Sequence, residues 1–362
     1  MSTTKRNTNI KVGISMGDVN GIGPELVLKT FDDSRMKNHF TPVVYGSVRA
    51  LNIYRKILHQ NKQKFHYSII QNASQAQGGR LNIVECAPKL ERVEIGKPSK
   101  SGAEVAHQAL KLAVEDAQHG MIDALVTLPV DKSTFQQHES SFSGHTEYLA
   151  KAFGVNDNLM LMVSEELRVG LVTNHLPLKE VSRNLSKTRV LNKIKLMHQC
   201  LQQDFSCAKP LIAVLGLNPH AGDNGLIGGE EQQIISGAIQ EASELGIMAT
   251  GPYPPDGFFG SLSYRKFDGI LAMYHDQGLI PFKLISGYRG VNFTAGIPFV
   301  RTSPDHGVAY DITGKDLADP ESFRQAIFTA IDVFKSRSEY LEAKENALPG
   351  MNTEWDFGDE EE

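Results

Sequence analysis

Three histidines stand in polar, turn-rich strings whose residue types suit metal chemistry. His175 lies in TNHLPL, His220 in LNPHAG and His275 in MYHDQG, and each string follows a short apolar run typical of a buried strand. The end of a buried strand can deliver an imidazole into a crevice, which is how many α/β proteins build a site. Three imidazoles delivered in this way would suit a divalent cation with an open coordination position.

A structural role is the alternative for each of these histidines, because a single histidine at a strand end is usually a hydrogen-bonded structural residue. The spacings between the three are long, and none belongs to a local motif such as H-E-x-x-H. A shared metal site and three separate structural histidines therefore both stay open at this point. Asp276 directly follows His275 and is a candidate to orient that imidazole.

The string SGHTE combines a polar loop with the expected start of a helix over residues 147–153. His145 and Thr146 are placed to hold an anion there, because free N–H groups and the helix dipole favour negative charge at a helix start. The alternative is that Ser143 or Thr146 caps the helix while His145 is simply exposed.

Arg301, Lys283 and Asn292 form a second set of groups that can bind an anion. Arg301 follows the apolar run of residues 297–300, and we expect it at the end of a strand. Its guanidinium is a planar fork that matches phosphate or carboxylate, although a surface salt bridge is the competing explanation. Lys283 lies in an amphipathic run, where an exposed lysine is the ordinary expectation.

The string GDVNGIGPE over residues 17–25 follows an expected strand and precedes an expected helix. Its glycines permit a tight turn, and Pro24 fits the first turn of a helix. The spacing matches neither G-x-G-x-x-G nor the Walker pattern of nucleotide-binding loops. We therefore interpret this string as a tight turn rather than as a nucleotide site.

The stretch from Asp305 to Pro320 resembles the adenosine-binding loop of the isocitrate and isopropylmalate dehydrogenases. That resemblance implies a nicotinamide cofactor near His306, Gly307 and Asp311. An acidic side chain at the position of Asp311 goes with NAD, because it accepts hydrogen bonds from ribose hydroxyls and repels a 2′-phosphate. Tyr310 departs from the dehydrogenase pattern, which has a proline there.

Short apolar runs alternate with helix-like periodic segments along most of the chain. The sequence predicts strands over residues 11–16, 41–45 and 123–128, and helices over residues 24–31 and 101–119. This alternation is typical of a largely parallel sheet covered by helices. We also expect a polar surface loop over residues 61–80 and a frayed, acidic C-terminal tail.

We expect two α/β/α domains that share one largely parallel sheet system, with the site in the cleft between them. The first domain would combine residues 1–128 with residues 302–362, and would include part of the NAD site and the acidic tail. The second would span residues 129–301 and carry the metal residues, the substrate residues and a dimer interface.

Composition and charge narrow the class of protein. The chain has 362 residues and a formal net charge of −5, which argues against a partner that needs a basic surface, such as nucleic acid. Its three cysteines form no C-x-x-C pair, which favours reduced thiols and a cytoplasmic setting. No apolar run is long enough to span a bilayer, so we expect no membrane association.

The strings NGIGPE, SGHTE, EELRV, TNHLPL, GLNPHAG, MYHDQG and RGVNFTAGIPFVRTS together resemble the 4-hydroxythreonine-4-phosphate dehydrogenases of pyridoxal phosphate biosynthesis. The resemblance extends from about residue 12 to about residue 327 and implies an isocitrate or isopropylmalate dehydrogenase-like fold. It implies that both subunits of a homodimer contribute the metal ligands His175, His220 and His275. It also implies that the substrate contacts are His145, Thr146, Lys283, Asn292 and Arg301.

The same resemblance implies the reaction, which is oxidation of the C3 hydroxyl of 4-phosphooxy-threonine. NAD would accept the hydride, and each site would hold one divalent cation, best zinc, with cobalt or magnesium as alternatives. A cation bound by imidazoles would lower the pKa of the hydroxyl, and the β-keto acid product would then lose CO₂. Lys283 and Asp276 are the candidates for catalytic roles, although Lys283 is equally placed to bind substrate only.

Three alternatives stay open. A sibling dehydrogenase for another phosphorylated hydroxy acid, such as 4-phosphoerythronate, would share the metal and the cofactor. A metal-dependent hydrolase or aldolase would use the three histidines without a nicotinamide, and a binding protein would catalyse nothing. The first string also departs from the family, since it reads SMGDVNGIG where many members have Gly-Glu-Pro-Ala-Gly.

Overall fold

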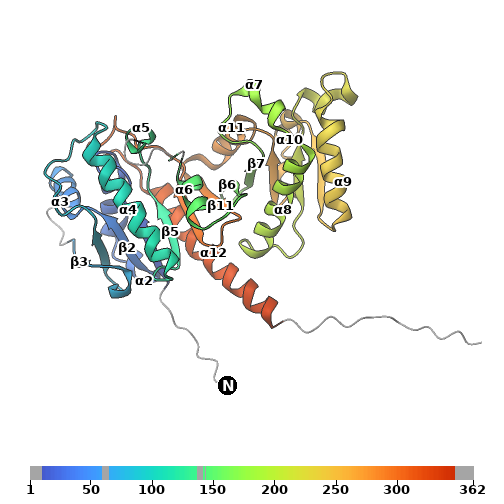
Figure 1. The fold of residues 1–362 in the computed structure, drawn as a ribbon. Coiled ribbons are helices and arrows are strands. Elements are labelled where there is room, and N and C mark those ends of the chain that lie inside the picture. The colour runs from blue at the N-terminus through green and yellow to red at the C-terminus, as the bar shows by residue number, and fades with distance from the viewer. Residues whose placement is uncertain (1–9, 59–64, 137–141, 143, 347–362) are drawn as a thin grey trace, which may run out of the picture.

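The structure is a computed structural model that describes residues 10–58, 65–136, 142 and 144–346 of the chain. Its described strands form one sheet of twelve, in the order β3-β4-β2-β1-β5-β12-β11-β6-β7-β10-β8-β9. Helices cover both faces of this sheet, and two lobes are joined through its middle strands (Figure 1). The predicted α/β architecture with one shared sheet is therefore confirmed.

The first lobe is built on six strands that run parallel to one another. They are β1 (Lys11–Ser15), β2 (Thr41–Gly46), β3 (Tyr67–Ile70), β4 (Leu81–Glu85), β5 (Ala124–Thr127) and β12 (Val300–Pro304). Its helices are α1 (Gly23–Asp32), α2 (Met36–His39), α3 (Val48–Ile57) and α4 (Lys100–Gln118). Helix α4 begins where the Ser99 hydroxyl accepts the N–H of Gly102 at 3.1 Å, as a capping serine does.

The second lobe continues the same sheet with a change of strand direction. Its strands are β6 (Leu159–Val163), β7 (Arg168–Leu171), β8 (Ile212–Leu215), β9 (Ala249–Tyr253), β10 (Gly269–Ala272) and β11 (Val291–Ala295). The pairs β12–β11, β11–β6 and β6–β7 are antiparallel, while β7, β10, β8 and β9 are again parallel. The helices are α5 (Lys132–Phe135), α6 (His145–Ala152), α7 (Leu178–Val181), α8 (Lys187–Gln203), α9 (Ser236–Glu244), α10 (Pro255–Gly260) and α11 (His275–Ser286).

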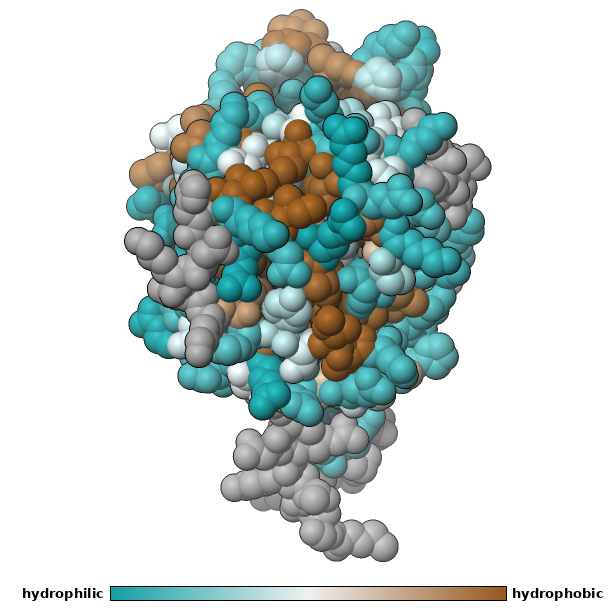
Figure 2. Space-filling model, turned by 90° about the vertical axis from the view of Figure 1, so that its left-hand side faces the viewer, coloured by the Kyte–Doolittle hydropathy of each residue, from teal (hydrophilic) through white to brown (hydrophobic). Residues whose placement is uncertain are grey.

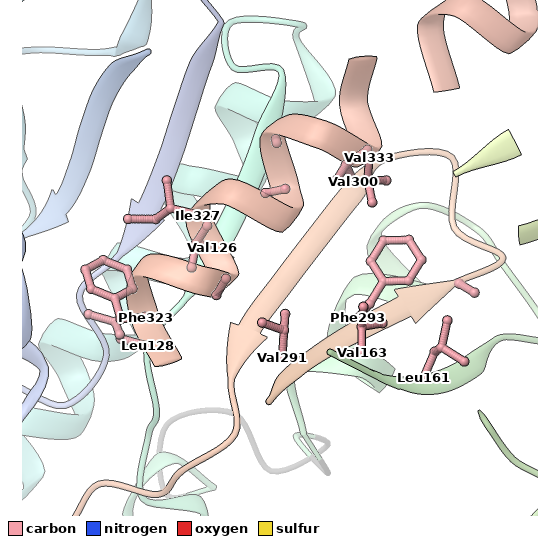
Figure 3. Packing of buried hydrophobic residues seen from close by; sticks show 14 of the residues in the cluster. Val126, Leu128, Leu161, Val163, Val291, Phe293, Val300, Phe323, Ile327 and Val333 are labelled. Atoms are coloured by element: carbon pink, nitrogen blue, oxygen red, sulfur yellow. The ribbon is translucent and has the colours of Figure 1, made fainter. Parts of the chain in front are cut away.

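Helix α12 (Glu321–Glu345) packs against one face of the middle strands (Figure 3). Phe323 and Ile327 of this helix belong to one buried cluster with Val126 of β5 and Val300 of β12. Successive side chains of a strand point to opposite faces of the sheet. The residues next to these valines therefore lie on the other face, where they are free to line a site.

A buried ion pair fixes α12 to the end of α8. The guanidinium of Arg337 donates to both carboxylate oxygens of Asp204, at 2.7 and 3.0 Å, and to the carbonyl of Ile297 at 3.1 Å. Removing one partner from a buried pair costs about 3–5 kcal/mol, because the other charge is left without compensation. We therefore assign Arg337 a structural role.

The prediction of a polar surface loop over residues 61–80 is wrong in part. Residues 67–70 form the edge strand β3, which pairs with β4, and residues 73–75 form a short 3₁₀ helix. The segment YSII is a short apolar run between polar residues, and only its pairing with β4 makes it a strand. Residues 61–64 and the acidic tail lie outside the described residues, and the division into domains stays a prediction.

None of the helices in the described ranges is long and apolar enough to cross a bilayer. On the side of the first lobe, hydrophilic side chains surround smaller hydrophobic areas (Figure 2). Ile69 on β3 is 62% exposed, and single exposed apolar residues are normal on a folded protein.

Candidate active site

A cleft of about 340 Å³ lies over the face of the middle strands that is opposite α12. Thr127 of β5, Asn292 of β11, and Arg301 and Ser303 of β12 line its floor. Arg301 and Ser303 share this face because they are two residues apart on one strand. The pairing of Asn292 with Ser303 in the sheet brings the two strands' polar side chains together.

Arg301 is the most deeply buried charge in the cleft, with 2% exposure. Its guanidinium donates to the hydroxyl of Thr127 at 3.1 and 2.6 Å and to that of Thr294 at 3.2 Å. Burial lowers the pKa of Arg301 to about 10, and the charge of Glu147 opposes this shift. The expected position is wrong in detail, because Arg301 is near the start of β12 and not at a strand end.

His145 is the first residue of helix α6 and lies in the same cleft. Its Nε2 atom is buried and has no hydrogen-bond partner within the described residues. Burial, and then the charges of Arg301 and Lys132, hold the pKa of His145 well below its ordinary value, so the ring is neutral. Among the described residues no side chain caps α6, so capping by Thr146 is not observed; Ser143 lies outside the described residues.

Lys283 and His306 complete the predicted groups in the cleft. Lys283, in the last turn of α11, forms an ion pair with Asp305 at 3.0 Å and remains half exposed. Two buried atoms, Nε2 of His306 and Oδ1 of Asn292, have no hydrogen-bond partner in the described part of the chain. The cleft therefore offers several buried polar atoms that a ligand can satisfy.

Lys132 and Glu147 also line the cleft, and sequence reasoning missed them. The charge of Lys132 lowers the pKa of both His145 and His175, after the larger effect of burial. Lys132 follows the end of β5 by five residues, which is the same strand-end signal that singled out the histidines. Glu147 lies within the SGHTE string that sequence reasoning did identify.

The three histidines do follow strand ends, as predicted. His175 comes after β7, His275 after β10 and His220 after β8, and these strands are neighbours in the sheet. The rings of His175 and His275 lie 5.8 Å apart between centroids, and Nδ1 of His275 is 2.7 Å from Oδ1 of Asp276. Within the described residues of one chain, no three metal-binding side chains form a group, so His220 does not join the other two.

Two buried side chains hold the histidine strings in place. Glu231 accepts the N–H groups of Leu217 and Asn218, both at 2.7 Å, at the entry to the turn that contains His220. Gln277 accepts the N–H of Met273 at 2.7 Å and donates to the carbonyl of Gly216 at 2.6 Å. The strings after β8 and β10 are therefore joined by hydrogen bonds.

The turn that carries His220 has an unusual backbone. His220, Ala221, Asp223 and Asn224 have φ values of 53°, 51°, 42° and 55°, in the left-handed region that side chains other than glycine rarely adopt. Such conformations cost about 1–3 kcal/mol each and tend to persist at functional sites. The strain supports a functional role for this turn.

The loop after β12 divides into two parts. His306 and Gly307 line the cleft, whereas Asp311 is exposed and is not among the residues that line it. The carboxylate of Glu25 on α1 accepts the N–H groups of Gly314 and Ala318 at 3.3 and 3.1 Å. The first helix of the chain therefore anchors the loop.

These features define an α/β protein with a cleft over a mixed sheet, a buried arginine in the floor of that cleft and a pair of neighbouring histidines. Comparison with known proteins places the chain within this class. It belongs to the family described as pyridoxal phosphate biosynthetic protein PdxA, whose model matches residues 38–330.

Individual relatives agree with this family. A 4-hydroxythreonine-4-phosphate dehydrogenase of Bacteroides thetaiotaomicron is 48% identical over 94% of this chain and 93% of its own length. A protein of Oceanobacillus iheyensis provisionally named D-threonate 4-phosphate dehydrogenase is 35% identical over 89% of this chain and 97% of its own length. The crystal structure of a 4-hydroxythreonine-4-phosphate dehydrogenase from Klebsiella pneumoniae matches with a TM-score of 0.79 and 32% identity, covering 90% of this chain and 98% of that one.

Proposed function

We propose that this protein is a 4-hydroxythreonine-4-phosphate dehydrogenase that uses NAD and one divalent cation. It oxidises 4-phosphooxy-threonine to 2-amino-3-oxo-4-phosphooxybutanoate, which loses CO₂ to give 3-amino-2-oxopropyl phosphate. One observation carries the proposal. Within the described residues, Arg301 is buried in the cleft and forms no ion pair with a carboxylate, and the nearby Nε2 atom of His145 has no hydrogen-bond partner.

The phosphate of the substrate binds at the floor of the cleft. Arg301 supplies a charged fork, and Asn292, with the neighbouring Thr146, supplies polar contacts. His145 is neutral and can donate one ring N–H to a phosphate oxygen. These contacts fix the phosphorylated end, and fixing one end of a small substrate orients the other for reaction.

The amino acid end of the substrate lies toward the charged side chains at the rim. Lys132 and Lys283 are cations, whereas Glu147 and Asp305 are anions, so the rim suits a zwitterion. The ion pair with Asp305 holds the ammonium group of Lys283 in place. Lys283 can bind the substrate there, or, once it has lost a proton, its neutral amine can accept the proton of the substrate hydroxyl.

His175 and His275 are suited to hold the cation. The contact between Nδ1 of His275 and Asp276 leaves Nε2 of that ring for a metal, an arrangement common among metal-binding histidines. A cation held by these two histidines would lower the pKa of the C3 hydroxyl, and NAD would supply the acceptor for the hydride from C3. Imidazole ligands suit zinc, which is the cation of this proposal, and cobalt or magnesium are the alternatives.

A third ligand, His220, comes from the partner subunit of a homodimer in this proposal. One chain brings only two of the histidines together, and His220 lies beside an apolar depression of about 540 Å³. Ile280 and Leu284, one turn apart on α11, line this depression with 59% and 81% exposure. Large exposed apolar side chains clustered on one face are typical of an interface between subunits.

Mixing two inactive variants tests the shared metal site. His175→Ala and His220→Ala should each lose cation binding and turnover while staying folded. Random re-association of the two would give half hybrid dimers, each with one intact site, and about a quarter of the wild-type activity. No recovery in hybrid dimers isolated with two affinity tags would contradict ligands from both subunits.

The substrate is tested by comparing rates of NAD reduction with 4-phosphooxy-threonine, 4-phosphoerythronate and D-threonate 4-phosphate. We expect kcat/KM to be highest for 4-phosphooxy-threonine, because the rim offers carboxylates for its ammonium group. Turnover of only one of the other two would overturn the substrate assignment. A protein that binds no NAD but hydrolyses or cleaves a phosphorylated compound would overturn the proposed reaction itself.

A further inference from the structure

The turn over residues 17–22, between β1 and α1, is the centre of a buried hydrogen-bond network. Asp18 is 1% exposed and Asn20 is fully buried. One carboxylate oxygen of Asp18 accepts the N–H of Asn20 at 2.9 Å, and the other accepts the hydroxyl of Tyr310 at 2.5 Å. Burial raises the pKa of Asp18, and the hydrogen bond from Tyr310 opposes that rise.

This contact joins the turn to the loop after β12. Tyr310 is next to Asp311, and the two partners of the hydrogen bond are 292 positions apart in sequence. The backbone supports the same junction, since the N–H of Ile22 donates to the carbonyl of Val308 at 3.1 Å. The loop has no regular secondary structure, so contacts of this kind must hold its shape.

The other side of the turn is tied to the segment that leads into α4. The side-chain amide of Asn20 donates from Nδ2 to the hydroxyl of Ser99 at 2.7 Å, and its Oδ1 accepts the backbone N–H of Glu94 at 2.7 Å. The Asn20 carbonyl accepts the N–H of Gly96 at 2.8 Å. Asp18 and Asn20 thus fix two distant segments relative to each other.

We propose that Asp18 and Tyr310 are positioning residues for the dinucleotide, and that their hydrogen bond sets the place of Asp311. The inference rests on the proposed use of NAD and on the resemblance of this loop to an adenosine-binding loop, which implies that Asp311 meets the adenosine ribose. A loop that is ordered before its ligand arrives loses less conformational freedom on binding, and the affinity is correspondingly higher. The GDVNGIG turn therefore serves the cofactor indirectly, without the nucleotide contacts of a glycine-rich fingerprint.

Tyr310→Phe in the full-length protein tests this role, because it removes the hydroxyl and keeps the ring. We expect the Kd for NAD to rise about tenfold or more, the loss typical of a hydrogen bond to a charged group. The Kd for ADP, which carries the adenosine and the diphosphate of NAD without the nicotinamide riboside, should rise by the same factor. The KM for 4-phosphooxy-threonine and the kcat at saturating NAD should change less than about twofold.

Ser99→Ala is the matched control, because it disturbs the same network on the side away from the loop. It removes a partner of Asn20 and the cap of α4, so the Tm should fall while the Kd for NAD stays unchanged. Equal weakening of NAD binding in both variants would overturn the positioning role in favour of general destabilisation.

A double-mutant cycle with Asp18→Asn isolates the hydrogen bond. If the hydrogen bond between Asp18 and Tyr310 is responsible for the loss of NAD affinity, the Kd of the double variant for NAD is no higher than that of the single variant with the higher Kd. Unchanged NAD binding by Tyr310→Phe, with normal binding by the wild type, would overturn this inference alone. A wild type that binds neither NAD nor ADP would overturn the proposed function first, and this inference with it.

Discussion

Replacing Arg301 with methionine separates its contribution to binding from its contribution to stability. Methionine keeps the length and the apolar contacts of the side chain but removes the charge. Burial lowers the pKa of Arg301 from 12.5 to about 10, which corresponds to roughly 3 kcal/mol of unfavourable free energy in the folded, ligand-free protein. We therefore expect the Tm of ligand-free Arg301→Met to equal or exceed that of the wild type.

Activity should change in the opposite direction. Loss of a buried guanidinium that pairs with a phosphate costs about 3–5 kcal/mol, because the phosphate keeps its desolvation and loses its partner. That loss corresponds to a fall in kcat/KM of between about a hundredfold and a few thousandfold. The measurement is steady-state NAD reduction at varied 4-phosphooxy-threonine, together with the shift in Tm that the substrate produces in each protein.

Arg337→Met is the control for this experiment, since Arg337 is also a buried arginine but has a carboxylate partner. It leaves Asp204 without compensation, so we expect a loss of about 3–5 kcal/mol in the free energy of unfolding, with kcat/KM unchanged. If Arg301→Met kept kcat/KM within threefold, or lost as much stability as Arg337→Met, the phosphate-binding assignment would be refuted.

The remaining predictions concern other parts of the site. Thr127→Val removes the hydroxyl that accepts from the guanidinium of Arg301, so the KM for substrate should rise about tenfold while the Tm changes little; an unchanged KM would count against it. Glu231→Gln should loosen the His220 turn and weaken zinc binding about tenfold in titration calorimetry, and unaltered affinity would contradict a supporting role. Asp311→Lys should weaken NAD binding and favour NADP in equilibrium titrations, and the assignment fails if both affinities stay the same. The pKa of His145 is lowered in the folded protein, so below about pH 6.5 the unfolded chain binds a proton more readily and the folded state loses stability. The drop in Tm from pH 7.5 to 5.0 should therefore be smaller for metal-free His145→Gln than for the metal-free wild type. Equal drops in Tm would contradict this prediction.

The architecture could be predicted from local patterns in the sequence. Apolar runs such as residues 11–16 and 123–128 became β1 and β5, within one or two residues at their ends. Strands that are buried on both faces are continuous apolar runs, so their composition alone distinguishes them from the polar segments around them. The strand β3 was missed because YSII is short and partly exposed, and only its partner β4 specifies it.

The site was predictable residue by residue but not in its assembly. Strand ends located His175, His220 and His275, yet their distances depend on strand order, which long-range pairing decides. His175 and His275 meet while His220 does not, and no local pattern distinguishes these cases. Lys132 follows a strand end as the histidines do, but a lysine there is ordinarily an exposed surface residue, and only the folded cleft gives it a role.

The unbroken sheet beneath the cleft has a consequence for how ligands enter and leave. Two lobes connected by a loose linker can swing apart, but here β5, β12, β11 and β6 hydrogen-bond edge to edge across the junction. Rotating one lobe away would break those ladders, so the floor behaves as a rigid template of fixed width. Movements that admit a ligand to Arg301 are therefore expected in the side chains and loops at the rim of the cleft and not in its floor.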